Sequence, residues 1–542
     1  MRQSLKRFKI DREEMIMTGI GTRTPITGMI VGLALALGAA GAADAQSVLR
    51  IKPFGDLKAI DPIVNSDYMA RNHGYMVYDT LFALDEKLNI RPQMVESHEK
   101  SADGLTWTFR LREGLSWHDG AAVTAADVVA SLERWGERDG LGQQLMARRA
   151  KLEAVDARTV RLTLKEAWGL VLDALAKPSS NVPFIMPERI ARTPSATSIT
   201  DPVGSGPFVM RKDEWVPGSK VVYVRNPAYK PRAEAPSGLA GAKQAGVDRV
   251  EWLYLPDAQT AANALQRGEI DIFEEIPPDL IPVFKRNPAV RIGRQDSLGV
   301  QAVFRINSIQ PPFDNPKVRQ AVRLMVDQTM FLSAYIDDPA LFTDCPSFFM
   351  CTSPYFSDAG WVKPDQAKAK AALAASGYDG TPVVVLHPTD STISHTFSLV
   401  AEQLMRDAGF KVDSQAMDWG TLTARRTSKN PVGQGGWSLF ISAPTGADMM
   451  EPVGHLGLRS NCDKAWFGWP CDDQIEKLRA EFTTTGDEAR RKEIARAIQL
   501  RALDTVPYMP VGQFYLVRGY SAKLSGILDA AIPVYWNIKK AP

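Results

Sequence analysis

One tetrapeptide in this sequence has residue types that could support nucleophilic catalysis. Ser97-His-Glu-Lys100 has the S-x-x-K spacing, in which a lysine lies close enough to activate a serine. The companion motifs of that chemistry are missing, because no K-T-G occurs and Ser66-Asp67 is followed by Tyr68 rather than by asparagine. No G-x-S-x-G, P-loop, G-x-G-x-x-G or H-E-x-x-H pattern occurs either. We interpret the tetrapeptide as a chance match and expect no enzymatic activity, with an exported hydrolase built from residues distant in sequence as the alternative.

The histidines do not have the spacing of metal ligands. The chain has six, at His73, His98, His118, His387, His395 and His455. Short, regular spacings are typical of metal sites, and none occurs here. We therefore expect neither a metal nor a cofactor, and we interpret His118 as a turn or surface residue.

The first 45 residues have the composition of an export signal. Six basic residues precede an apolar run from Ile26 to Ala40, and Ala43-Asp-Ala45 fits the A-x-A cleavage pattern. The apolar run is too short for a stable membrane span. We expect Gln46 to begin the mature chain, which places the protein in the periplasm. Met15 or Met17 is an alternative start, and a short membrane anchor is the alternative role for the segment.

Composition limits the classes of function that the mature chain can have. Cleavage after residue 45 removes 6 of the 64 basic and 4 of the 62 acidic residues, which leaves 58 of each and no net charge. A neutral balance argues against nucleic acid as a partner and against electrostatic binding to a membrane surface. The remaining 497 of the 542 residues exceed the roughly 250–300 at which one core stops growing, so at least two lobes are expected. No long apolar stretch follows the signal, which predicts a soluble mature protein.

The four cysteines fall into two close pairs, Cys345 with Cys351 and Cys462 with Cys471. An exported chain enters an oxidising compartment, where an even number of locally paired cysteines favours disulfides. Metal or redox chemistry is the alternative, but these spacings are not those of common zinc sites. We predict two small disulfide-closed loops.

Strand-like and helix-like segments alternate along the chain, which predicts an α/β (mixed α+β) fold. Predicted strands cover Thr106–Leu111, Val160–Leu164, Arg249–Leu255, Val383–Leu386 and Phe514–Val517. Four predicted helices have both limits: Asn315-Pro316 to Val326, Lys363 to Ser376, 472–483 and 487–504. Two more are predicted by their C-terminal ends, one at Gly268 and one near Gly409. Pro231–Gly246, rich in Ala, Pro and Gly, is interpreted as a surface loop.

The most informative stretch is Leu111–Gly120, followed directly by Ala121–Leu132. Asp119-Gly120 supplies the positive φ of a tight turn, and Thr124 can cap a helix whose first turn contains Asp127. Local chemistry therefore predicts a strand, a turn and a capped helix.

This stretch resembles the signature of the family 5 extracellular solute-binding proteins, the peptide, dipeptide and nickel receptors of bacterial ABC importers. The resemblance extends over nearly all of the chain beyond residue 45. Segments that match in the expected order are Ala59–Pro62, Tyr78–Phe82, Pro92–Ser97, Val203–Phe208, Asn226–Tyr229, Gly268–Ile272 and Pro312–Ala321. Each match alone is weak, but their shared order is specific.

The resemblance implies the large two-lobe periplasmic-binding-protein fold, with an extra α/β region and a hinge. Lobe I would comprise 46–78, 190–302 and 507–542, the extra region 79–189, and lobe II 303–506. The chain would cross between the lobes near 302 and near 507.

By the same resemblance, the protein would be a monomeric, non-catalytic receptor that closes on a small solute. The solute would be peptide-like or another small organic molecule. Its partner would be an inner-membrane ABC permease with a cytoplasmic ATPase. A chaperone-like or haem-carrying binder of the same fold is a further alternative.

Three segments are candidates for contacts with the ligand. The residues singled out in them are Asp67, Tyr68, His387, Thr389, Trp419 and Trp437. Asp67 would pair with a cation, while Tyr68 and the tryptophans would supply aromatic area. The alternatives are a helix N-cap for Asp67, an ordinary capped loop for 387–390 and core positions for the tryptophans.

Family members that bind peptides hold the α-amine with an aspartate three residues after the strand tryptophan. The matching residue here is Phe440, which cannot replace the charge of a carboxylate. The sequence therefore predicts weak binding of ordinary peptides, unless the nearby Asp448 provides the missing charge.

The cysteine pairing gives a direct test. Titration of the denatured, unreduced mature protein is expected to find essentially no free thiol, because each cysteine has a local partner in an oxidising compartment. Two or more reactive thiols per chain would contradict the pairing.

Overall fold

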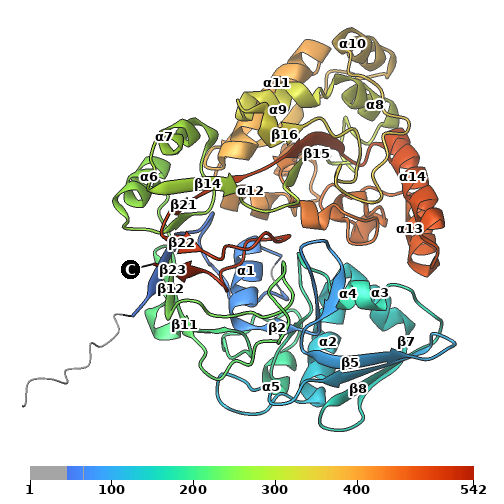
Figure 1. The fold of residues 1–542 in the computed structure, drawn as a ribbon. Helices are drawn as coiled ribbons and strands as arrows, with labels where there is room; N and C mark the ends of the chain where they lie inside the picture. Colours follow the sequence, from blue (N-terminus) through green and yellow to red (C-terminus); the bar gives the residue numbers. More distant parts are fainter. Residues whose placement is uncertain (1–45, 65, 542) are drawn as a thin grey trace, which may run out of the picture. The chain divides into compact units, whose positions relative to one another are not determined.

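Runs of β-branched and aromatic residues form three larger sheets in this computed structural model, which describes residues 46–64 and 66–541 (Figure 1). The predicted signal segment lies outside the described residues. The seven-stranded sheet has the order β10 (Phe208–Met210), β11 (Lys220–Arg225), β12 (Arg249–Leu253), β1 (Val48–Lys52), β13 (Ile272–Phe273), β21 (Val517–Ser521) and β14 (Val290–Arg294). The six-stranded sheet has the order β16 (Phe342–Thr343), β20 (Met509–Phe514), β15 (Val300–Ile306), β19 (Leu439–Ser442), β17 (Val383–Pro388) and β18 (Val412–Met417). The four-stranded sheet has the order β5 (Val95–Lys100), β6 (Thr106–Leu111), β8 (Thr159–Leu164) and β7 (Arg149–Ala154). The mixed α+β class is confirmed.

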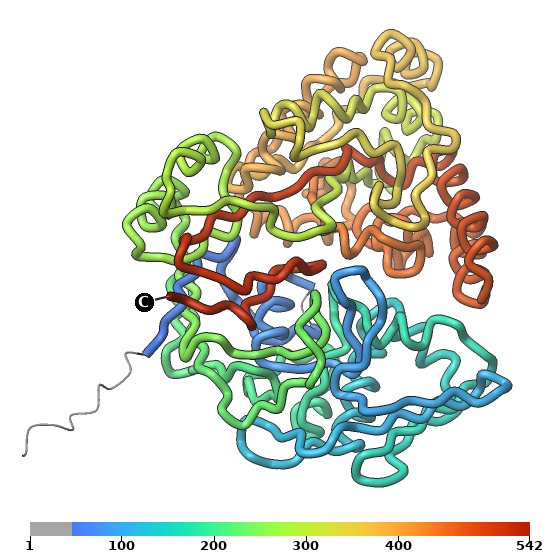
Figure 2. Tube along the Cα trace, in the orientation of Figure 1, coloured from blue at the N-terminus to red at the C-terminus, as the bar shows by residue number. Residues whose placement is uncertain are grey.

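Two connections carry the chain between the two largest sheets. β14 leads to β15 through 295–299, and β20 leads to β21 through 515–516. The two connections lie side by side, because β15 pairs with β20 and a Cβ added at Gly299 would come within 2.5 Å of the Phe514 carbonyl oxygen (Figure 2). The seven-stranded sheet thus draws strands from the N-terminal, middle and C-terminal parts of the chain. The crossing at 295–299 lies close to the predicted position near 302, whereas the crossing at 515–516 lies beyond the predicted position near 507, because β20 pairs with β15 in the six-stranded sheet.

Helices cover both sheets through their apolar faces. α9 (Gln328–Tyr335) and α11 (Thr392–Ala408) pack on the six-stranded sheet, with α8 (Pro316–Met325) and α10 (Gln366–Ala375) packed against each other and on α11. α13 (Asp473–Thr484) packs against α14 (Glu488–Thr505). On the seven-stranded sheet, α1 (Tyr68–Val77) contacts β10, while α6 (Ala258–Arg267) and α7 (Ile281–Lys285) contact β13 and β14. The shorter helices are α4 (Val171–Leu175), α5 (Glu188–Ala191) and α12 (Trp419–Arg425).

The signature stretch folds as its local chemistry predicts. β6 ends at Leu111, Gly120 has φ +89°, and α2 (Ala125–Arg138) begins with a reciprocal capping box between Thr124 and Asp127. α2 packs on β7 and β8, and α3 (Gly140–Arg148) follows it. His118 lies in a turn, as predicted, and is half-buried. Its ring accepts from the Gly204 amide at 3.2 Å, and burial lowers its pKa to about 4.

Two predicted elements have different limits in the structure. The alanine-rich helix begins at Gln366 rather than at Lys363, because the side chain of Asp365 caps it by accepting from the Lys368 amide. The predicted strand Phe514–Val517 is instead the junction of β20 and β21, which belong to different sheets. Four apolar residues in a row do not reveal that the chain changes sheets between them.

The 231–246 segment is a loop, but it is not confined to the surface. Residues 238–243 are buried, and the fully buried ammonium group of Lys243 pairs with Asp79 at 2.7 Å. Tyr229 donates to the other oxygen of the same carboxylate. A buried lysine requires such a partner. The ion pair therefore holds this loop against β2 (Asp79–Thr80).

Both predicted disulfides are present. Cys345 bonds Cys351 with a Cα–Cα distance of 5.7 Å, and Cys462 bonds Cys471 with 4.2 Å. Each closes a short local loop in the part of the chain that carries the six-stranded sheet.

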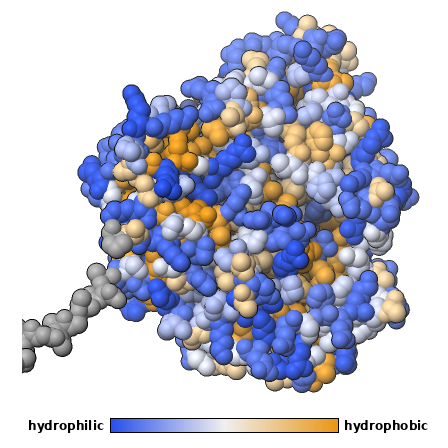
Figure 3. Space-filling model, viewed as in Figure 1, coloured by the Kyte–Doolittle hydropathy of each residue, from blue (hydrophilic) through white to orange (hydrophobic). Residues whose placement is uncertain are grey.

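The surface of the described residues is largely polar. Large exposed hydrophobic side chains are few, and the face drawn in Figure 3 shows them as separate patches among hydrophilic residues. Within the described part of the chain, no helix is both long enough and apolar enough to cross a membrane.

His455 is a buried histidine that the fold holds in its neutral form. Its Nδ1 accepts from the Leu458 amide at 3.2 Å, so the proton lies on Nε2, which faces the Phe348 carbonyl oxygen at 2.9 Å. A second proton would have to enter on the nitrogen that already faces an N–H group. Burial accordingly lowers the pKa of His455 to about 3.

The depressed pKa predicts a contribution to acid unfolding. The stabilising contribution is complete above the unfolded-state pKa of about 6.5, and it is lost as the pH falls toward the folded-state pKa. Over that window, His455 adds about 1.4 kcal/mol per pH unit to the slope of the unfolding free energy. Urea unfolding of His455→Gln between pH 6 and 4 is expected to show a slope that is shallower by about that amount. The exposed His98→Gln is the matched control, and an unchanged slope in His455→Gln would refute the assignment.

Candidate ligand-binding site

A buried carboxylate, that of Asp448, joins three segments that are far apart in sequence. It ends the 3₁₀ turn η5 (Gly446–Asp448) that follows β19. Its Oδ2 accepts four hydroxyl hydrogen bonds, from Tyr68 at 2.7 Å, Ser180 at 3.1 Å, Ser179 at 3.2 Å and Thr445 at 3.4 Å. Tyr68 begins α1, and the two serines follow α4, so the six-stranded sheet is linked here to the rest of the chain.

This carboxylate has no counter-charge. Its residue is 7 % exposed, and no lysine or arginine among the described residues forms an ion pair with it. Neutral hydroxyl donors offset part of the desolvation cost of a buried anion but do not cancel its charge. Asp448 is therefore a position at which a cationic group would be strongly favoured.

Tyr68 is held in place from both sides. The side chain of Asp67 caps α1 by accepting from the Met69 amide, so the N-cap alternative for Asp67 is confirmed, and burial raises the pKa of this carboxyl. On the other side, the Arg71 guanidinium lies 4.4 Å from the centre of the Tyr68 ring and donates to Ser179. Burial, together with the neighbouring Asp448, raises the pKa of Tyr68 far above its usual range, so the phenol remains a donor.

A second charged group, Arg426, follows α12 within a cluster of aromatic rings. Its guanidinium carbon lies within 6.0 Å of four ring centres, those of Phe467 at 4.9 Å, Phe440 and Trp466 at 5.8 Å, and Trp419 at 6.0 Å. Its Nε is buried and has no hydrogen-bond partner in the described part of the chain. Burial lowers the pKa of Arg426 to about 10, and the nearby Tyr68 opposes that shift. The group remains a cation at neutral pH.

The two tryptophans singled out from the sequence lie in this cluster in different roles. Trp437 is fully buried among Leu386, Phe440 and Trp469, and its indole donates to the Arg426 carbonyl at 3.1 Å. Trp419 is half-buried and turns one face toward the Arg426 guanidinium. Trp437 thus positions Arg426, while contact of either ring with a ligand stays a prediction.

The loop that carries Trp466 and Phe467 is fixed by a fully buried arginine. Arg305, in β15, donates to the carbonyl oxygens of Phe467 at 2.5 Å, Gly457 at 2.9 Å, Trp466 at 3.0 Å and Pro507 at 3.1 Å. Burial lowers its pKa to about 9, so it stays charged. Four carbonyl dipoles stabilise this cation in place of a carboxylate. Through them, Arg305 holds the surrounding loops against β15.

His387 and Thr389 lie at the end of β17, at the same sheet edge as α12. The ring of His387 faces Glu402 of α11 at 2.8 Å and His395 at 2.7 Å, and Thr389 donates to the Met417 carbonyl oxygen. Their hydrogen bonds therefore stay within this sheet and its helix. Their contact with a ligand remains a prediction.

The structure favours the alternative left open at Phe440, in which Asp448 provides the charge that Phe440 lacks, and the strength of peptide binding stays a prediction. Phe440 is fully buried in β19, where it lies opposite Arg305 on one side and beside Leu386 on the other. The carboxylate of this region is Asp448, eight residues later, on the turn that leaves the sheet. Counting from a tryptophan could not locate it, because the intervening loop sets the register.

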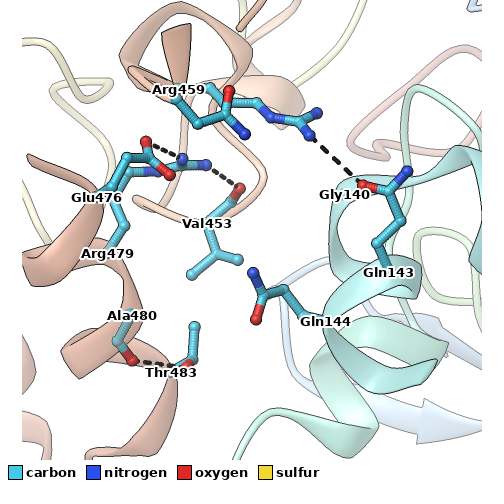
Figure 4. Close-up of a pocket in the computed structure, with 10 residues that line it drawn as sticks. Gly140, Gln143, Gln144, Val453, Arg459, Glu476, Arg479, Ala480 and Thr483 are labelled. Atoms are coloured by element: carbon cyan, nitrogen blue, oxygen red, sulfur yellow. Dashed lines mark hydrogen bonds and ion pairs between the residues drawn. The ribbon is translucent and has the colours of Figure 1, made fainter. Parts of the chain in front are cut away.

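A separate cavity of about 150 Å³ lies between α3 and α13 (Figure 4). In it, Arg479 pairs with Glu476 at 2.6 Å, while Arg459 donates to the neutral amide oxygen of Gln143 at 3.4 Å. The cavity lies at a contact between two parts of the chain.

Two sheets joined by adjacent crossings, with charged groups gathered where the two parts meet, define a two-lobe periplasmic binding protein. The chain belongs to the bacterial extracellular solute-binding proteins of family 5, whose middle-region pattern matches residues 89–464. The family is a class of transport proteins that bind substrates. The resemblance noted from the sequence is confirmed.

Individual relatives resemble the whole chain. A probable peptide ABC transporter periplasmic-binding protein, y4tO of Sinorhizobium fredii, is 39 % identical over 90 % of this chain and 92 % of its own. The glutathione-binding protein GsiB of Escherichia coli K12 is 27 % identical over 92 % of this chain and 94 % of its own length. The solved structure of the oligopeptide-binding protein AppA of Bacillus subtilis, in complex with a nonapeptide, superimposes with a TM-score of 0.77. It covers 92 % of this chain and 100 % of its own at 19 % identity, so this likeness shows the fold alone.

Sequence reasoning missed several residues of this site. Ser179 and Ser180 had no signal beyond a polar loop after a proline, and their role depends on a carboxylate 268 or more residues away. Arg426 had a weak signal, an arginine just past a short helix that Asp418 caps. None of these could be recognised before the chain was folded.

The role of Arg305 can be tested by its removal. Arg305→Met would remove a donor from four carbonyl oxygens, of which that of Trp466 keeps the Trp469 amide, and is expected to destabilise the protein by at least about 3 kcal/mol in urea unfolding. Arg267→Met, an exposed arginine paired with Glu269, is the control and should change stability by less than about 0.5 kcal/mol. Equal stability of the two variants would contradict the assigned role.

Proposed function

We propose that this protein is the solute receptor of an ABC importer and that it captures a short peptide or peptide-like compound by its free amino group. The single observation that carries the proposal is Asp448, a buried carboxylate surrounded by four hydroxyl donors and without a counter-charge. An ammonium group would supply that charge and would replace weak hydroxyl partners with an ion pair.

The relatives support the same class of ligand. One of them is named as the periplasmic-binding protein of a probable peptide transporter and another as binding glutathione, and peptides and glutathione both carry a free amine. A permease of the inner membrane with its ATPase would be the partner, and export by the first 45 residues would bring the receptor to the periplasm. The receptor would act as a monomer without catalysing a reaction.

Binding would depend on closure of two lobes. We assign lobe I to 46–78, 190–302 and 507–542, the extra region to 79–189 and lobe II to 303–506, except that β20 (Met509–Phe514) pairs with the strands of lobe II. The two adjacent crossings would form the hinge. Asp448 and Arg426 would come from lobe II, Tyr68 from lobe I, and Ser179 and Ser180 from the extra region. A ligand that contacts both sides favours the closed state, because only that state makes all of its contacts.

The amine contact gives the decisive experiment. Isothermal calorimetry with a panel of di- and tripeptides and glutathione is expected to find binding by the wild type, and N-acetylation of the bound compound should abolish it. Asp448→Asn should weaken the same compound by about a hundredfold or more, because a buried ammonium would lose its anionic partner. Asp413→Asn, which removes an exposed carboxylate on β18, is the matched control.

Two results would overturn the proposal. One is equal binding of free and N-acetylated compounds, which would remove the amine from recognition. The other is turnover of a bound compound without stoichiometric binding, which would make the protein a hydrolase. Mass spectrometry of the compound that co-purifies with the protein would check the ligand class independently.

A further inference from the structure

The cavity between α3 and α13 contains a guanidinium without a counter-charge. Residues of both helices and of the loop that precedes α13 line it (Figure 4). Among the described residues, Arg459 makes a single hydrogen bond, to the amide oxygen of Gln143 at 3.4 Å, and no ion pair. Burial and the neighbouring guanidinium of Arg479 lower the pKa of Arg459. A cation therefore lies at this cavity with most of its donors unused.

Two further polar groups of the cavity lack partners. The Oδ1 atom of Asn461 is buried and accepts no hydrogen bond in the described part of the chain. On the opposite wall, the side-chain oxygen of Gln144 accepts from Arg148 at 2.6 Å, while its amide nitrogen has no acceptor within residues 46–64 and 66–541. Buried polar groups normally find a partner, in the protein or in a bound molecule. The cavity thus offers donors from both walls and an acceptor to an occupant.

The charge of the cavity favours an anion. Two of its lining residues, Arg459 and Arg479, are cations, and only Glu476 is an anion. Glu476 already pairs with Arg479 at 2.6 Å and accepts from the Ser460 amide at 2.7 Å. The positive charge that remains is that of Arg459. A cation would meet like charge here, whereas an anion would gain charge-assisted hydrogen bonds.

Size and hydrogen bonding narrow the class of occupant. A cavity of about 150 Å³ is as large as an engineered protein cavity that holds benzene, so a small polyatomic ion fits. The planar donors of a guanidinium match the oxygens of an oxyanion. A buried acceptor without a donor costs free energy, so Asn461 favours an ion that carries a hydroxyl group. Hydrogen phosphate carries one at neutral pH, and sulfate does not.

We propose that the cavity between α3 and α13 is a second binding site, separate from the candidate ligand site, for a small oxyanion with a hydroxyl group, of which hydrogen phosphate is the simplest. Arg459 and Gln144 would donate to its oxygens, and Asn461 would accept from its hydroxyl group. The walls come from different parts of the chain, because α3 lies in 79–189 and α13 in 303–506. An ion that contacts both walls would hold them together, and this bridging role rests on the proposed closure of two lobes.

Each wall is also connected to the amine site. Asp139 caps α3 and pairs with Lys177, whose ammonium donates to the Ser180 carbonyl oxygen at 2.8 Å. On the other wall, Arg479 donates to two carbonyl oxygens of the segment that follows Asp448. The Ser180 hydroxyl donates to Asp448, so the two connections meet at that carboxylate. An oxyanion in the cavity would therefore favour the arrangement in which the amine site is complete.

The binding experiment compares the wild type, Arg459→Met and Arg192→Met, an exposed arginine paired with Glu188, as the matched control. Calorimetry with inorganic phosphate at pH 7 should detect binding by the wild type and by Arg192→Met. Arg459→Met should bind phosphate at least about tenfold more weakly, because it loses a charge-assisted hydrogen bond. Its urea midpoint should stay the same or rise, because two neighbouring guanidinium groups no longer repel each other.

Two further measurements separate a specific site from a general effect of salt. Sodium sulfate should bind the wild type about tenfold more weakly than phosphate at equal ionic strength, and Asn461→Leu should remove that difference, because the acceptor for the hydroxyl group is gone. Small-angle scattering of the peptide-free wild type should give a smaller radius of gyration in phosphate than in sodium chloride, and Arg459→Met should show no such change.

The outcomes separate this inference from the proposed function. Phosphate binding is measured without peptide, so a peptide panel that fails leaves the oxyanion site standing. Equal phosphate affinity in the wild type and Arg459→Met, or no binding by either at millimolar concentration, would refute the site and leave the amine site intact. Phosphate binding without compaction would refute the bridging role. Equal affinity of the wild type for phosphate and sulfate would refute the role of Asn461.

Discussion

Charges that are buried without a counter-charge are the constraint on which this site depends. Several other buried charges are paired, as in Arg134 with Asp61 and Lys243 with Asp79, both at 2.7 Å. At the site the fold leaves Asp448 to hydroxyl donors and Arg426 to aromatic faces. Both arrangements lower the cost of a buried charge without cancelling it. The remaining cost is the free energy that a ligand of complementary charge can recover.

Rigid neighbours make such an arrangement possible. The indole of Trp437 fixes the backbone of Arg426, the guanidinium of Arg305 fixes the loop that carries Phe467, and α1, capped by Asp67, fixes Tyr68. These contacts lie within the body of one sheet or one helix. The hydroxyls around Asp448 come from three segments, so this junction is the one that a movement at the two crossings would open and close.

Local chemistry predicted several of the elements and their limits. The Asp119-Gly120 turn, the Thr124 cap and the helix ends at Gly268 and Gly409 follow from residues within one turn of each feature. The errors arose where a distant contact decides. Lys243 is buried because Asp79 lies opposite it, and the apolar run at 514–517 is divided because its two halves pair with different sheets.

The sequence by itself determined the class of this protein, because the ordered signature segments and the paired cysteines are properties of the chain read in one dimension. The candidate ligand site was decided by the tertiary structure. Ser179 and Tyr68 contribute to it only because folding brings them to Asp448. Phe440 lies in the core because it is in a strand, whereas Asp448 lies at the site because it is on the turn beyond that strand. Side chains of similar local sequence become core or site according to what packs against them, and that information lies hundreds of residues away.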